Sequence, residues 1–416
     1  MVFERPRGVR DIAPREMMSR KYAQSVISSI FDSYGYMELQ TPTFEFLDLF
    51  KAKSGSEITD HLYVFEDKGG RSLCLRPEAT ASVARMYCSD LRTHQKPLRL
   101  YYVCPMFRYE EPQKGRYREF WQAGVELIGS SGPSADAEVI IQASDCLRKL
   151  GLRCRIRVSH IGVVRHLLKS RGFNAESQDK LIQLLDKGDM KAVREMISDE
   201  KIVGLFNVKG SSDVVEDVKK LLADDELTPL IEEFQKTLSL LDAAGVEYTV
   251  DFSMARGLDY YTGIIFDVKV DELGAQNQVA GGGRYDDLIS LFGGPNTPAV
   301  GYAFGLDRIV EAVGVQGIGV LADAVDAMVI PLGENMRGKA FEVAHSLRAE
   351  LGGRRVVLDI SERKLNKALQ YAAESGVRYA VIVGEKEAAT GSVMLKDMSS
   401  KTQDEVLISE LSKRII

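Results

Sequence analysis

The segment from Phe120 to Leu127 most constrains the fold, because its two sets of alternating residues differ in kind. In a β-strand, alternate side chains point to opposite faces. One face would carry Phe120, Gln122, Gly124 and Glu126, and the other Trp121, Ala123, Val125 and Leu127. The second set is apolar and predicts a core face. The first set offers a ring, an amide, a gap and a carboxylate, so we expect it to form the floor of a pocket for a small polar ligand.

An arginine and a carboxylate precede this strand and predict contacts with a nucleotide. Arg108 and Glu110 are two residues apart, so they would share one face of the preceding strand. An arginine can bind a phosphate through two parallel hydrogen bonds, and a carboxylate can accept from an exocyclic amine. The alternative is a solvated hairpin in which both residues join Arg116, Arg118 and Glu119 in exposed salt bridges.

Three further segments carry glycine next to arginine or tyrosine. MARGLDYYTG, at 254–263, places Arg256, Tyr260 and Tyr261 at the entrance to a predicted strand, where glycine lets backbone approach a ligand closely. VAGGGRYDD, at 279–287, puts three glycines before Tyr285, although a triplet can also form a simple bulge or turn. PAVGYAFGLDRI, at 298–309, predicts a strand that passes into a helix, with Arg308 near the junction. Helix starts and arginines both favour phosphates, but Arg308 could equally be a surface arginine.

The chain is long enough for two or more domains, at 416 residues. Residues 14–34 have an apolar residue every fourth position and predict a helix. Charged, amphipathic helical segments fill 172–245 and separate two groups of strands, as an inserted helical block would. Near residue 319 the pattern becomes strands alternating with helices, which predicts a compact α/β domain with a mainly parallel sheet. We therefore expect domains at 1–321 and 322–416.

Composition narrows the class of protein further. The chain is 45% apolar and 27% charged, which is typical of a folded soluble protein. No segment reads as a signal peptide or a membrane span, so we expect a cytoplasmic protein without a membrane partner. The five cysteines and five histidines show no metal-ligand spacing, so no protein-built metal site is expected. The net charge of −6 does not exclude an RNA partner, because local basic patches matter more than the sum.

Taken together, these segments resemble the class II aminoacyl-tRNA synthetases. PMFRYEEPQKGRYREFWQAGVELIG, at 105–129, resembles motif 2 of that class, GYAFGLDR resembles motif 3, and the segment around Pro42 is a weaker likeness of motif 1. LRPEATA, ARGLDYYTG and GGGRYDDL resemble the histidyl-tRNA synthetase family within the class. The C-terminal pattern is similar to that family's anticodon-binding domain, so the resemblance covers nearly the whole chain.

The resemblance implies a multidomain α/β and α+β protein: an antiparallel catalytic sheet flanked by helices, a helical insertion at 172–245 and a C-terminal α/β anticodon-binding domain. It implies a homodimeric, ATP-dependent ligase that makes histidyl-adenylate from L-histidine, with Mg²⁺ accompanying ATP, and transfers the amino acid to tRNA(His). It assigns ATP to Arg108, Glu110, Phe120 and Arg308, and catalysis to Arg108 and Arg256. It assigns histidine to Glu78, Thr80, Gln122, Glu126, Tyr260, Tyr261 and Tyr285. It assigns the acceptor end of tRNA to Gln113, Lys114, Arg116 and Arg118.

Two alternatives remain at this point. One is the catalytically silent paralogue that regulates ATP phosphoribosyltransferase, which typically lacks the anticodon domain and degrades the ARGLDYY segment. Both features are present here. The other is a class II ligase for a different amino acid, which the histidine-type segments disfavour.

Overall fold

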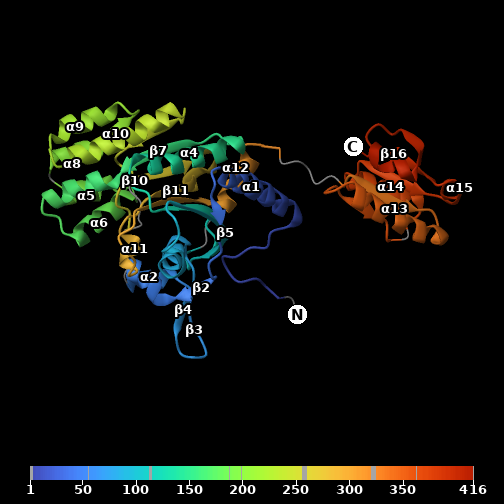
Figure 1. Cartoon of the computed structure of the whole chain (residues 1–416), viewed down its shortest axis with the longest axis horizontal. Helices are drawn as coiled ribbons and strands as arrows, with labels where there is room; N and C mark the ends of the chain where they lie inside the picture. The colour runs from blue at the N-terminus through green and yellow to red at the C-terminus, as the bar shows by residue number, and fades with distance from the viewer. Residues whose placement is uncertain are drawn as a thin grey trace. The chain divides into compact units, whose positions relative to one another are not determined.

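Two compact units make up the chain, Met1–Ile318 and Gly319–Ile416, each built around a β-sheet of its own (Figure 1). The computed structural model describes residues 3–54, 56–111, 115–186, 188–197, 199–254, 260–319, 325–361 and 363–415. Within these ranges, no helix has the length and apolar character needed to cross a membrane.

The first unit contains a nine-stranded sheet that is mostly antiparallel. Its strands in spatial order are β1 (Met37–Glu38), β5 (Leu98–Phe107), β6 (Glu119–Ile128), β12 (Ala299–Gly305), β11 (Gln278–Arg284), β10 (Ile264–Lys269), β7 (Arg155–His160), β9 (Tyr248–Asp251) and β8 (Lys209–Gly210). The pairs β1/β5 and β7/β9 are parallel. This mainly antiparallel sheet confirms the predicted fold class, and the prediction of a strand running into a helix at 298–309 is also confirmed by β12 and the helix after it.

The long β5–β6 hairpin fixes which side chains face the core. Its register runs from Leu98 opposite Ile128 to Phe107 opposite Glu119. Ala123, Val125 and Leu127 are fully buried or nearly so, as the alternation predicts. One detail of the prediction is wrong: β5 ends at Phe107, so Arg108 and Glu110 lie beyond the strand and do not share a strand face.

Three helices of the first unit cover the sheet: α1 (Pro14–Ser33), α4 (Pro133–Lys149) and α12 (Leu306–Val315). Helix α1 packs against α4 and α12. Its buried stripe includes Ala23, Ile27 and Phe31 at four-residue spacing, so the 3.6-residue period of the helix directs them to one side. Phe31 reaches the rings of Tyr101 and Tyr302, with centroids 5.3 and 6.3 Å away. These contacts join the helix to two strands of the sheet, and the helix predicted for 14–34 is confirmed.

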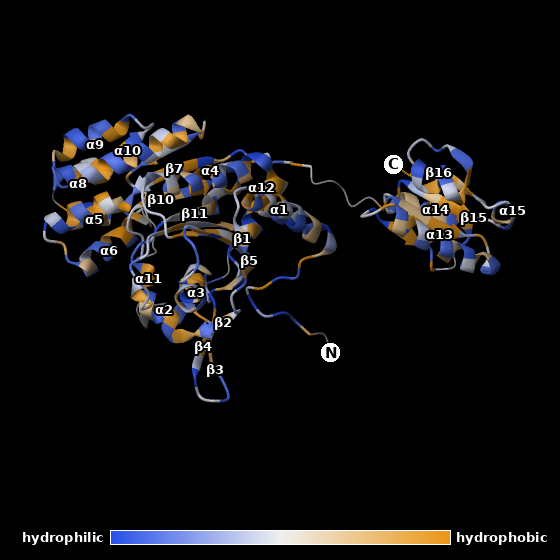
Figure 2. Ribbon diagram, in the orientation of Figure 1, coloured by the Kyte–Doolittle hydropathy of each residue, from blue (hydrophilic) through white to orange (hydrophobic). Residues whose placement is uncertain are grey.

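In the described part of 161–247, a block of six helices follows β7 and precedes β9. The helices are α5 (Ile161–Ser170), α6 (Ala175–Asp186), α7 (Met190–Met196), α8 (Glu200–Leu205), α9 (Val214–Leu222) and α10 (Thr228–Ala243). Figure 2 shows mixed hydrophilic and hydrophobic residues along α9 and α10. In α9 the buried residues are Val215, Val218 and Leu222, which lie on one face. Helix α10 packs on α4, so the block is anchored to the nine-stranded sheet through a helix pair.

The first unit also contains a smaller sheet and three short α-helices. They are β2 (Phe44–Phe46), β4 (Ser72–Leu75), β3 (Val64–Glu66), α2 (Leu47–Ser54), α3 (Thr80–Met86) and α11 (Leu288–Leu291). Their core contains Leu47, Phe50, Leu62, Cys74 and Ala81. This small core holds α2 and α3 together, and both helices carry side chains of the site.

The second unit has a five-stranded sheet. It contains β14 (Val356–Leu358), β13 (Ala327–Pro331), β15 (Tyr379–Val383), β16 (Ser392–Asp397) and β17 (Gln403–Leu407), with helices α13 (Arg337–Glu350), α14 (Leu365–Glu374), α15 (Glu385–Ala389) and α16 (Leu411–Arg414). The pairs β13/β14 and β13/β15 are parallel, and the pairs β15/β16 and β16/β17 are antiparallel, so the sheet is mixed rather than mainly parallel. The connection at 384–391 is shorter than a parallel crossover needs, which forces β16 to turn back.

Candidate active site

A cavity of about 410 Å³ opens over the middle of the nine-stranded sheet. Strands β6, β11 and β12 form its floor, the start of α3 and the start of α12 lie at its edges, and tyrosines line one side. Its lining includes these predicted site residues: Glu78, Thr80, Arg108, Glu110, Arg116, Phe120, Gln122, Tyr260, Tyr261, Tyr285 and Arg308. Residues from both ends of the first unit's sequence thus meet in one place.

Glu126 lies beneath this cavity and is 1% exposed. Its carboxyl group accepts a hydrogen bond from Thr80 Oγ1 at 2.7 Å and another from the hydroxyl of Tyr285. Burial raises the pKa of Glu126 to about 8, although the two hydroxyl donors oppose that rise. The floor of the site is therefore a carboxyl group that holds its proton near neutral pH and is ready to share it with a ligand.

Position 301, on the strand next to Glu126, has to be a glycine. A Cβ at Gly301 would lie 2.1 Å from Glu126 Oε2 and 2.4 Å from the Val125 carbonyl oxygen. Gly301 pairs with Glu126 across β12 and β6, so the missing side chain makes room for the carboxyl group. The three glycines at 281–283 lie inside β11, which excludes a turn as their structural role.

Three tyrosines form a wall around the carboxyl group. The rings of Tyr260 and Tyr261 are 4.7 Å apart, and those of Tyr260 and Tyr285 are 5.9 Å apart and nearly perpendicular. Burial raises the pKa of Tyr285 well above its ordinary value, and the neighbouring Glu126 adds to the effect. Tyr285 is therefore a neutral hydroxyl donor, and it is Tyr285 that bonds Glu126.

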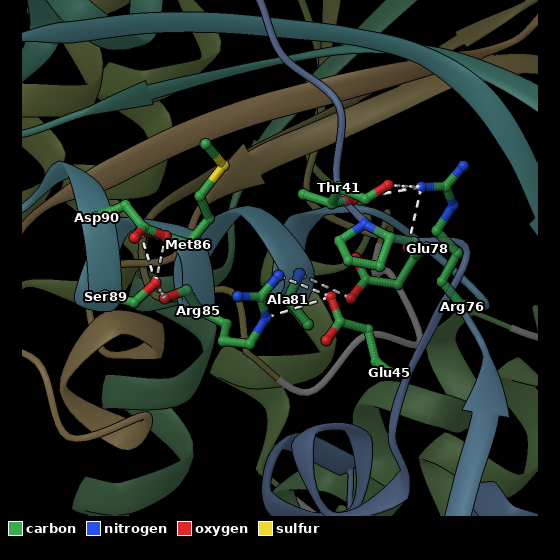
Figure 3. Close-up of polar contacts among 10 residues, drawn as sticks. Thr41, Glu45, Arg76, Glu78, Ala81, Arg85, Met86, Ser89 and Asp90 are labelled. Carbon is green, nitrogen blue, oxygen red and sulfur yellow. Dashed lines mark hydrogen bonds and ion pairs between the residues drawn. The ribbon is translucent and has the colours of Figure 1, made fainter. Parts of the chain in front are cut away.

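Glu78 caps the first turn of α3. One carboxylate oxygen accepts from the backbone amide of Thr80 at 3.1 Å, and the other from that of Ala81 at 3.0 Å. Figure 3 shows the contact with Ala81. A carboxylate at a helix N-terminus is favoured by the helix dipole. Burial alone would raise the pKa of Glu78, but Lys53, the Ala81 amide and Arg108 hold it below its ordinary value. Glu78 is consequently an anion inside the site.

The other end of the cavity is rich in arginine. Arg108 donates through Nε to the Pro77 carbonyl at 2.9 Å, and its guanidinium lies 5.2 Å from the centre of the Phe120 ring. Glu110 is 3.9 Å from Arg108 and 3.6 Å from Arg116. The salt-bridged hairpin considered above is thus partly formed, but its members face the cavity and not only solvent.

Arg308 lies at the first turn of α12, as its sequence position predicted. Its Nη1 binds Glu311 at 2.5 Å. Its Nη2 is buried and has no hydrogen-bond partner among the described residues. Gly115 has a φ of +80°, which favours glycine, and a Cβ there would lie 1.9 Å from Nη1, so any other residue would also displace the guanidinium. A buried guanidinium nitrogen facing a cavity has the chemistry to bind an anion.

Several predicted site residues are not in the described lining of the cavity. Arg256, Gln113 and Lys114 lie outside the described residues. Arg118 is not in the cavity lining; its guanidinium donates to the Glu110 carbonyl at 3.0 Å and stacks 4.1 Å from the centre of the Tyr109 ring. Across the described ranges, no group of three potential ligand side chains could hold a metal ion.

Sequence reasoning missed Lys53 and Tyr102. The side chain of Lys53 is 3% exposed, and its Nζ lies 3.0 Å from Glu78 Oε1. The sequence carried one signal for Lys53. It follows Phe50, which is buried, by three residues, and residues with this spacing are neighbours on a helix surface. Tyr102 lines the cavity opposite Gly124, where a Cβ would lie 2.5 Å from its hydroxyl. The available clue to Tyr102 was a glycine that pairs with an aromatic residue on the adjacent strand.

Comparisons with known proteins identify the family of this chain. The sequence profile of the family described as histidyl-tRNA synthetase matches residues 8–309, and that of the anticodon binding domain matches 326–416. The histidine–tRNA ligase of Archaeoglobus fulgidus is 43% identical, with 99% of this chain and 98% of the relative covered. That of Methanocaldococcus jannaschii is 40% identical, with 99% of each chain covered. The crystal structure of apo Staphylococcus aureus histidyl-tRNA synthetase has 25% identity, a TM-score of 0.75 and full coverage of both chains.

The silent regulatory paralogue finds no support in these matches, since the C-terminal profile is that of an anticodon-binding domain. A ligase for a different amino acid is likewise not supported, because the matching relatives carry the histidine name. The chain belongs to the histidyl-tRNA synthetase family and is an aminoacyl-tRNA ligase.

Proposed function

We propose that this chain activates L-histidine with ATP to histidyl-adenylate and transfers histidine to the 3′ end of tRNA(His). In the first step a carboxylate oxygen of histidine forms a bond to the α-phosphorus, and the bond to the leaving pyrophosphate breaks. In the second step the terminal ribose hydroxyl of the tRNA attacks the acyl carbon and AMP leaves. The observation that carries the proposal is the buried Glu126 carboxyl group, held by Thr80 and Tyr285 beneath the cavity.

Selectivity for histidine would come from polar contacts with both its imidazole ring and its ammonium group. The Glu126 carboxyl group and Tyr261 would hold the two imidazole nitrogens, with Tyr260 and Tyr285 as the wall. Glu78, Thr80 and Gln122 would bind the ammonium group. A ligand without ring nitrogens would leave a buried polar group unpaired, which costs a factor of roughly 10⁴ to 10⁵ in such sites.

ATP would occupy the arginine end of the cavity. Arg108 would bind the α-phosphate, Phe120 would stack on the adenine, Glu110 would accept from its amine, and Arg308 would bind the far phosphates. Arg256 is proposed as the second catalytic arginine on family resemblance alone. Class II synthetases use ATP with a divalent metal. We propose Mg²⁺ that enters on the ATP phosphates, since such ions keep several waters and few protein ligands, and it would neutralise phosphate charge.

The tRNA would contact both units. In the first, Arg116 is placed at the cavity and Arg118 beside it; Gln113 and Lys114 belong to the same proposed acceptor-end loop. In the second unit, a pocket of about 400 Å³ combines Lys364 and two ion-paired arginines, Arg337 with Glu334 and Arg363 with Asp359, with the exposed ring of Phe341. Cationic side chains beside an exposed ring suit a phosphate and a stacked base. The pocket supports tRNA binding by this unit.

A homodimer is proposed from the small sheet. Four of its apolar side chains are 41 to 52% exposed: Phe44, Phe46, Val64 and Phe65. The rings of Phe44 and Phe65 are 6.3 Å apart, and Phe46 lies on the same sheet face, so these three rings form one patch, while Val64 lies on the other face. Such a patch is typical of a surface covered by a partner, and a second copy of this chain would cover it. The cysteines are all unpaired thiols, which supports the proposed cytoplasmic location.

Histidine-dependent exchange of labelled pyrophosphate into ATP tests the proposal. We expect exchange with histidine and none above background with the other nineteen amino acids. A silent regulatory protein would show no exchange with any amino acid, and a ligase of different specificity would respond to another one.

A further inference from the structure

Lys53 is a buried cation in contact with two parts of the proposed histidine site. Its Nζ is 3.0 Å from Glu78 Oε1 and 3.9 Å from the centre of the Tyr260 ring. An ammonium group over a tyrosine face is attracted by the ring. Helix α2 holds Lys53 in place, because the preceding turn buries Phe50 in the core shared with α3. A single side chain thus joins the carboxylate at one end of the site to the aromatic wall.

The contacts of Glu78 show which acceptor position of its carboxylate remains free when Lys53 is bound. A carboxylate has about four acceptor positions. Among the described residues, Oε1 receives the Ala81 amide and Lys53, while Oε2 receives the Thr80 amide alone. One acceptor position therefore remains, on Oε2. Figure 3 shows Glu78 at the start of α3, with its carboxylate turned to the backbone at Ala81.

The charges around Glu78 favour a fixed anion at this position. Lys53 and Arg108 are the cations that act on it, while the neighbouring Glu126 would add a second negative charge if it were ionised. Burial lowers the pKa of Lys53, so an ionised Glu78 is what keeps this lysine charged. Removing the lysine would leave a buried carboxylate that is free to take up a proton or to turn.

We propose that Lys53 is a positioning residue for the amino-acid substrate: it fixes the Glu78 carboxylate so that the free acceptor position of Oε2 meets the ammonium group. This inference rests on the proposed histidine site. The lysine acts through Glu78 and does not touch the ligand. Its effect should therefore appear only with ligands that carry an ammonium group.

Two histidine analogues separate this role from the alternatives. Histidinol keeps the ammonium group and lacks the carboxylate, whereas 3-(imidazol-4-yl)propionate lacks the ammonium group and keeps the carboxylate. We would measure the Kd of each by calorimetry with the full chain, the Lys53→Met variant and the Glu78→Gln variant. Lys51→Met is the matched control, because Lys51 is exposed on the same helix.

Lys53→Met should raise the Kd of histidinol by about 10-fold or more, the effect of a charged hydrogen bond, while that of the propionate changes by less than about threefold. In the Glu78→Gln background the same substitution should change the histidinol Kd by less than about threefold, since the two residues act as a unit. Lys51→Met should change neither Kd. If Lys53→Met does not fold, Lys53→Gln is measured in the same way.

Three results would overturn the proposal. Tighter histidinol binding by Lys53→Met would mean that the lysine only occupies the ammonium site. A loss confined to the propionate would place Lys53 on the substrate carboxylate, and equal changes for both ligands would make its role purely structural. If the parent chain binds neither analogue and shows no histidine-dependent exchange, the proposed histidine site fails; exchange together with an unaffected Lys53→Met variant refutes the lysine's role alone.

Discussion

Replacing Glu126 with glutamine separates the ligand-binding role of this residue from its effect on stability. The substitution is nearly isosteric; the amide oxygen can accept from one of the Thr80 and Tyr285 hydroxyls while the amide NH2 donates to the other, so the fold should be retained. What it removes is the carboxyl group that would hold a proton between itself and the imidazole. We expect histidine activation to lose about 1 to 3 kcal/mol, the range for a buried polar group that loses its hydrogen-bond partner, or roughly 5- to 160-fold in kcat/KM.

The effect of the same substitution on stability depends on pH, and its sign follows from the raised pKa. A carboxyl group with a folded-state pKa of about 8, against an ordinary 4.5, stabilises the fold fully below pH 4.5 and loses this contribution as the pH rises through 8. Between pH 6 and pH 9 the loss is about 2 to 3 kcal/mol by the linkage relation. The melting temperature of the parent should therefore fall more over this interval than that of Glu126→Gln.

Pyrophosphate exchange and thermal melting on the same preparations check both expectations. Glu119→Gln is the matched control, because Glu119 is exposed at the start of the same strand. An exchange kcat/KM for histidine within twofold of the parent would show that Glu126 does not bind the substrate. Parallel melting curves for parent and variant between pH 6 and pH 9 would show that its carboxyl group is not buried as described.

Three further outcomes are expected. Asp307→Asn should destabilise the first unit by about 3 to 5 kcal/mol, measured by urea unfolding, because Asp307 is the buried carboxylate that pairs Arg10 and Arg20; an unchanged midpoint would contradict the pairing. Arg256→Ala should lower kcat for exchange far more than it raises the KM for histidine, since its proposed role is to stabilise transition-state charge; a rise in KM alone would make it a binding residue. A chain that ends at Ile318 should still exchange pyrophosphate but charge tRNA poorly, because it lacks the second unit; equal charging would refute an anticodon role for that unit.

The site was predictable wherever a repeating pattern defined its geometry. Alternation along residues 120–127 gives the two faces of β6, and the strand-to-helix pattern at 298–309 places Arg308 on the first turn of α12. Both follow from local periodicity, which the sequence displays directly. The triplet of glycines was ambiguous, because its role depends on the side chains of Tyr302 and Ile265 on neighbouring strands.

The parts that could not be predicted depend on contacts distant in sequence. The pairing of Lys53 with Glu78 requires the small core that holds α2 against α3, and no local pattern reports that packing. The bond from Tyr285 to Glu126 joins residues 159 positions apart. The antiparallel turn of β16 depends on the length of its connection, which a count of alternating strands and helices does not reveal.

Charging of tRNA(His) with labelled histidine by the full chain tests the central claim most directly. With ATP and Mg²⁺ present, the account predicts histidine esterified to the terminal ribose of tRNA(His), and no charging of a tRNA for another amino acid. Absence of esterified histidine from a preparation that binds tRNA and ATP, or esterification of a different amino acid, would contradict it.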